Sequence, residues 1–256
     1  MSAKTTYPML RERNLILVLL LVLAAISWAI LIWQSIISDK QGMGIMAGMD
    51  APLFIAIWIV MMVAVMFPTA APMILIFAQV YAGKREHGQP FVPTWVFVSS
   101  YLLVWTLFGV LAYAAALGAE EVGKQSMWLM DNAARFGGGV LILAGLYQLS
   151  PLKHSCLSKC RTPMNFILSS WREGYWGSFR MGLEHGLYCL GCCWLLFIIL
   201  FPLGVMNVAA MAVITLLIFA EKSLALGQEI AKIAAVVLIV YGALVIFVPS
   251  MLPTMI

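Results

Sequence analysis

A polar loop leads into an apolar stretch at Met181-Gly-Leu-Glu-His-Gly-Leu-Tyr-Cys-Leu-Gly-Cys-Cys-Trp-Leu-Leu-Phe197. This segment holds three of the five cysteines and one of the three histidines of the chain. At about 100° per residue, a helix places His185, Cys189 and Cys192 within an arc of about 60°. We therefore predict one helix face of soft donor atoms, with Cys193 at its edge.

A second cluster, His154-Ser-Cys-Leu-Ser-Lys-Cys160, lies shortly upstream and contains Cys156 and Cys160. The two clusters together hold every cysteine of the chain. Cysteines used only for packing in a helical bundle have no reason to gather in this way. The clustering therefore favours a shared site, and simple packing stays as the alternative.

The composition excludes an ordinary soluble domain. Of the 256 residues, 63% are hydrophobic and 10% are charged, whereas soluble domains are about 45–50% apolar and about 25% charged. The net charge of +4 comes from basic residues spread over short loops, which is typical of topology determinants rather than of nucleic-acid binding. The chain is predicted to be a polytopic membrane protein.

Hydrophobic runs predict an all-α bundle of about seven transmembrane helices within one integral membrane domain, residues 1–256. Pro68 and Pro72 should kink the second helix. A short interfacial helix is expected from Pro163 to Trp171, where aromatic residues suit the headgroup boundary. The predicted spans are Leu15–Ile37, Ala51–Ala82, Phe91–Leu117, Phe136–Leu149, Gly182–Phe201, Asn207–Leu226 and Ile230–Val248.

Basic residues predict the orientation of this bundle. With the N-terminus inside, 12 of the 15 Lys and Arg residues fall on inner segments, as the positive-inside rule requires. The N-terminus is then cytoplasmic, and both cysteine clusters lie near the cytoplasmic face. The chain contains no nucleotide-binding motif.

The cysteines are predicted to bind a soft metal ion. The cytosol keeps thiols reduced, and thiolates with imidazole select copper(I), zinc or an iron–sulfur cluster. On the second predicted helix, Met62 and Met66 share a stripe with Met73, and more methionines (Met43, Met46 and Met49) precede it. Because thioethers bind copper(I) and not zinc, the stripe favours copper, although methionine is also a common packing residue.

Two other functions remain open from the residues alone. Cys156 with Cys160, and the adjacent Cys192 and Cys193, would also suit a membrane thiol–disulfide oxidoreductase. A zinc-stabilised structural or assembly protein would use the same ligands. Among the other polar groups, Glu184 is predicted to be an interfacial charge. Glu221 and Lys222 are predicted to extend toward the membrane boundary.

The segments Trp58–Pro68, Tyr147–Pro163 and Arg180–Trp194 resemble a bacterial family of predicted metal-binding integral membrane proteins. This family includes a membrane copper chaperone encoded beside a tyrosinase. The resemblance covers roughly residues 50–225. It implies copper handling at the bacterial cytoplasmic membrane, and it carries over the cysteines of both clusters and His185 as candidate ligands.

Residues and resemblance together predict a membrane protein that binds copper(I), with zinc as the alternative ion, and delivers it to a cuproenzyme. We expect no catalysis. Cys189, Cys192 and His185 would form the core of the site. Cys156, Cys160 and Cys193 would join it, with Met62 and Met66 as secondary ligands.

Overall fold

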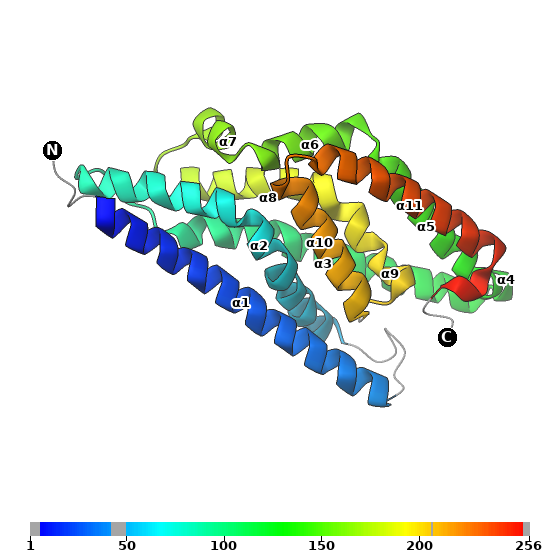
Figure 1. The fold of residues 1–256 in the computed structure, drawn as a ribbon. Helices are drawn as coiled ribbons and strands as arrows, with labels where there is room; N and C mark the ends of the chain where they lie inside the picture. The colour runs from blue at the N-terminus through cyan, green and yellow to red at the C-terminus, as the bar shows by residue number, and fades with distance from the viewer. Residues whose placement is uncertain (1–5, 42–49, 206, 253–256) are drawn as a thin grey trace.

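The computed structural model describes residues 6–41, 50–205 and 207–252, and every secondary-structure element in these ranges is helical. The all-α prediction is therefore confirmed (Figure 1). In chain order the elements are α1 (Thr6–Gln41), α2 (Ala51–Glu86), α3 (Thr94–Gln125), α4 (Met127–Asp131), α5 (Ala133–Gln148), α6 (Pro151–Arg161), α7 (Pro163–Ser170), α8 (Gly174–Ile198), α9 (Leu200–Leu203), α10 (Val208–Ser223), α11 (Gly227–Phe247) and the 3₁₀ helix η1 (Pro249–Met251).

Within the described residues, five helical segments are long and apolar enough to cross a membrane. They are Arg11–Ile37, Ala51–Glu86, Thr94–Gln125, Gly174–Leu203 and Gly227–Phe247. The two other predicted spans correspond to α5 and α10, each of 16 residues. A helix of that length covers about 24 Å, less than the about 30 Å of hydrocarbon in a bilayer. A count of seven crossings thus stays a prediction.

The bend of α2 has a local cause. Pro68 and Pro72 both lie inside this helix, and each removes a backbone donor and crowds the preceding turn. Figure 1 shows α2 changing direction along its length. Most of the residues of α2 from Met61 to Ala82 are buried, so this bent helix forms the centre of the bundle.

The bundle is assembled from helix pairs. α1 packs on α2, α3 on α8 and α5 on α11. The α5–α11 crossing is tight because Gly138 and Gly242 face each other. A Cβ on Gly138 would lie 2.7 Å from the carbonyl oxygen of Gly242, and one on Gly242 would lie 2.6 Å from that of Gly138. Small residues allow such close backbone contact between membrane helices.

The segment between α5 and α8 forms two short helices. The Ser150 side chain caps α6 by accepting a hydrogen bond from Lys153 N at 3.2 Å, which satisfies a free donor of the first turn. α6 packs along α8, and this contact brings the two cysteine clusters together. α7 ends at Ser170 and so matches the short helix predicted from Pro163 to Trp171.

Candidate metal site

The α8 face predicted from the sequence lies in the interior of the bundle. His185, Cys189 and Cys192 are at most 3% exposed, and Cys193 is 1% exposed. The face turns inward because α3 packs against α8 at Gly182 and Gly186, where side chains and carbonyls of α3 leave no room for a Cβ. The donor atoms are therefore shielded from solvent and lipid.

Cys189 is the centre of the cluster. Its Sγ atom lies 3.0 Å from Tyr101 Oη and 3.9 Å from Met66 Sδ. Lys222 Nζ donates a hydrogen bond to the same sulfur at 3.0 Å. Residues from α2, α3 and α10 thus meet one thiol of α8, and the ammonium of Lys222 stabilises negative charge on the sulfur.

The other thiols surround Cys189. Cys192 Sγ lies 4.0 Å from Cys160 Sγ and 3.2 Å from Cys193 Sγ. Cys189 also interacts with the thiols of Cys160 and Cys193. All five cysteines are free thiols. The structure therefore brings one cysteine of α6 to three cysteines of α8.

Cys156 lies at the margin of this cluster. It is partly exposed, and its Sγ atom is 2.7 Å from the position that a Cβ on Gly191 would occupy. The bare backbone of Gly191 therefore makes room for the thiol. Burial raises the pKa of Cys156 above the usual thiol value.

His185 lies in a cage of aromatic rings. Its ring stacks on Phe97 and Tyr101, with centroid separations of 5.9 and 5.3 Å, and contacts Phe166 at 5.6 Å. Both ring nitrogens are buried and have no hydrogen-bond partner among the described residues. A buried polar atom without a partner costs about 1–3 kcal/mol, and a metal ion on either ring nitrogen would offset that cost.

The methionine stripe is only partly joined to the thiols. Met66 contacts Cys189, while Met62 lies one helical turn earlier in α2 and is fully buried. Met73 is also buried. The methionines at positions 43, 46 and 49 lie outside the described residues.

Three polar predictions have different outcomes. The carboxylate of Glu184 pairs with Arg172 at 3.0 Å and Arg180 at 3.3 Å, and its place at the membrane interface stays a prediction. The prediction that Glu221 and Lys222 extend to the boundary was wrong. Glu221 is 1% exposed, and Lys222 points to Cys189.

The sequence did contain a signal for these two residues, because ionisable groups near the end of an apolar helix often mark function. It contained none for Tyr101, which is one aromatic residue among many in α3. Only the packing of α3 on α8 assigns Tyr101 to the cluster.

The cluster is a set of donors rather than a finished coordination sphere. Among the described residues, no three Cys, His, Asp or Glu side chains already hold the geometry of a metal site. The thiols instead contact one another and the neighbouring polar groups. Thiols, a thioether and an imidazole are the ligand types that select soft copper(I), so the donor chemistry fits this ion.

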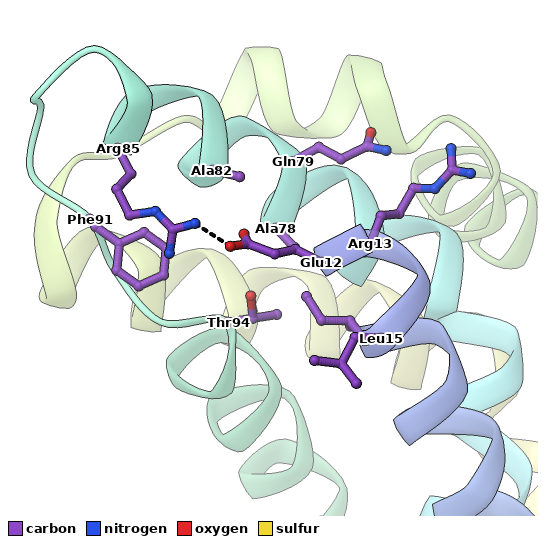
Figure 2. A pocket seen from close by; sticks show the side chains of 10 residues that line it. Glu12, Arg13, Leu15, Ala78, Gln79, Ala82, Arg85, Phe91 and Thr94 are labelled. Atoms are coloured by element: carbon purple, nitrogen blue, oxygen red, sulfur yellow. Dashed lines mark hydrogen bonds and ion pairs between the residues drawn. The ribbon is translucent and has the colours of Figure 1, made fainter. Parts of the chain in front are cut away.

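A separate pocket lies elsewhere, between the start of α1, the end of α2 and the start of α3. It has a volume of about 270 Å³. Figure 2 shows Glu12 paired with Arg85 across it, beside Phe91. Its lining contains no cysteine, histidine or methionine. This pocket therefore has no donors for a soft metal ion and is distinct from the thiol cluster.

A comparison with protein families matches residues 55–245 to PpoB2, described as a copper chaperone. The chain belongs to this copper chaperone family. The matched region includes all five cysteines, His185, Met62 and Met66. No curated protein and no solved structure matches the chain. Membership of the copper chaperone family supports a copper-related role and agrees with the resemblance seen in the sequence.

Proposed function

We propose that this protein binds copper(I) through the thiols of α6 and α8 and delivers it to a copper enzyme. The observation that carries the proposal is the meeting of Cys160, Cys189 and Cys192 with the thioether of Met66. Thiolate and thioether together favour copper(I) over zinc. Family membership supports the same metal.

The donors differ in their access to solvent, which suits transfer. Cys189, Cys192 and Cys193 are buried, whereas Cys156 and Cys160 on α6 are partly exposed. We assign Cys189 and Cys192, with His185, to the inner site. The α6 cysteines would exchange the ion with an acceptor at the cytoplasmic face, one thiolate replacing another. This exchange makes and breaks only metal–ligand bonds and converts no substrate, as expected of a chaperone.

Metal analysis of the reduced, detergent-purified protein after copper(I) loading tests this proposal. The variant with Cys189→Ser and Cys192→Ser should lose the bound copper. The control variant with Ser155→Ala and Ser158→Ala, on the exposed side of α6, should retain it. Zinc in place of copper would point to a structural clamp, and absence of any metal from the unaltered protein would refute copper binding.

A thiol–disulfide oxidoreductase is the second candidate, favoured by the separation of 4.0 Å between Cys160 Sγ and Cys192 Sγ. Such an enzyme would cycle this pair between dithiol and disulfide. Mass-shift alkylation of intact cells, before and after chemical reduction, distinguishes the two functions. Thiols that stay reduced under all growth conditions contradict redox cycling.

A further inference from the structure

A buried ionic clamp joins three helices beside the thiol cluster. Lys153 of α6 donates to Glu221 Oε2 of α10 at 2.6 Å. Gln148, at the end of α5, bridges the pair: its Nε2 donates to Glu221 Oε1 at 2.9 Å, and its Oε1 accepts from Lys153. All three side chains are at most 2% exposed.

This arrangement is a costly way to stabilise a helix bundle. Removing two charges from water carries a desolvation penalty of several kcal/mol per ion, and apolar replacements of a buried pair are often neutral or stabilising. In a membrane protein, buried ionisable groups are rare and often mark functional regions. The clamp is therefore better explained by its effect on the position of α6 than by a gain in the stability of the bundle.

The clamp lies on the same face of α6 as the cysteine that reaches α8. Lys153, Leu157 and Cys160 follow a spacing of four and then three residues, so they share one side of the helix. At the opposite end of α6, Arg161 Nη2 donates to the carbonyls of Leu224 and Ala225 at 2.8 and 3.1 Å. Helix α6 is thus fastened at both ends to α10 and the turn that follows it.

The two adjacent residues at the end of α10 act on two different helices. Glu221 holds α6 through Lys153, and Lys222 contacts Cys189 of α8. The same turn of α10 therefore sets the position of α6 relative to the central thiol.

We propose that Lys153, Glu221 and Gln148 are positioning residues that hold Cys160 of α6 against the thiols of α8. The position of Cys160 can be tested without metal. The expected effect of that position on copper binding rests on the function proposed above. Loss of the clamp should separate Cys160 from Cys192 and lower copper(I) affinity about tenfold, the scale found for residues that orient metal ligands.

Disulfide trapping measures the placement directly. The background protein keeps Cys160 and Cys192, with Ser at Cys156, Cys189 and Cys193. Diamide oxidises the two thiols to a disulfide and takes up the two hydrogens. In this background Lys153→Met with Glu221→Gln removes both charges, so that neither is left buried alone. The matched control, Lys232→Met with Glu229→Gln, removes an exposed ion pair of 2.9 Å on α11.

A charge-swapped variant, Lys153→Glu with Glu221→Lys, separates positioning from general loss of stability. The amide of Gln148 both donates and accepts, so a flip of this group lets it bridge the reversed pair. We expect the neutral variant to form the disulfide at least several-fold more slowly, and the swapped and control variants to form it at the original rate.

An unchanged trapping rate in the neutral variant would overturn the proposal. Slower trapping that the swap does not restore would also overturn it, because the loss would then come from a disturbed bundle. Copper titration is a separate arm in the chain with all five cysteines. In that chain, Lys153→Met with Glu221→Gln should lower the affinity for copper(I). When Cys160→Ser is already present, the same two substitutions should cause no further loss of affinity. If the unaltered chain binds no copper, the proposed function fails while the trapping result still decides the role of the clamp.

Discussion

At the scale of single residues, the imidazole ring of His185 has an unusual environment. Its two ring nitrogens are buried without partners among the described residues, inside a cage of aromatic rings. For His185→Phe we expect a gain of about 1 kcal/mol in stability, because the partnerless atoms disappear, together with weaker copper(I) binding. Thermal unfolding and copper titration of the same preparation measure both. A variant that is less stable but binds copper normally would assign His185 to packing.

The contact between Met66 Sδ and Cys189 Sγ, at 3.9 Å, distinguishes copper from zinc. Met66→Leu keeps the volume, and such swaps usually cost less than about 1.5 kcal/mol. The variant should therefore fold, bind copper(I) several-fold more weakly and bind zinc as before, since only copper accepts a thioether. Competition titrations with both ions provide the measurement, with the exposed Met164→Leu as control. Equal loss for both ions would contradict a thioether ligand.

Protons should compete with copper at the thiols. Cys156 has a raised pKa because it is partly buried, so its thiol is protonated over a wider pH range than a free cysteine. Copper(I) affinity should fall with decreasing pH, by about tenfold per pH unit for each proton released on binding. Titrations at neutral and mildly acidic pH, corrected for the competing chelator, provide the test. An affinity independent of pH would rule out thiolate ligation.

At the scale of elements, the α6–α8 contact depends on the missing side chain of Gly191. A Cβ there would meet Cys156 Sγ at 2.7 Å, and a thiol can rotate away more easily than a backbone can move. Gly191→Ala should therefore leave the fold intact and expose Cys156, raising its alkylation rate several-fold. Gly139→Ala, where an added Cβ has nothing within 4 Å, is the control. No change at Cys156 would mean that α6 is held away from α8.

At the scale of the whole molecule, the path of α5 decides which side of the membrane α6 faces, because α5 is the last predicted span before α6. With the N-terminus inside, α6 is cytoplasmic if α5 crosses, as the positive-inside count predicts. In a cysteine-free background, Ser158→Cys should resist a membrane-impermeant maleimide in intact cells, whereas Lys124→Cys should react. Both positions are exposed. Labelling of Ser158→Cys from outside would show that α5 does not cross the membrane.

The sequence alone determined the class of the fold, the long apolar helices and the candidate ligands. These follow from local properties, since hydrophobic length defines a membrane helix and periodicity defines a helix face. His185, Cys189 and Cys192 needed only the geometry of one helix to be grouped together.

Only the tertiary structure decided which distant residues complete the cluster. Cys160 meets Cys192, Tyr101 and Lys222 meet Cys189, and Glu221 turns inward to Lys153. These contacts depend on how α3, α6 and α10 pack around α8, and no local pattern specifies that packing. A charged residue near the end of a helix can extend to the boundary or pair inside the protein. The choice depends on whether a partner of opposite charge lies within reach, and that is a property of the packed bundle.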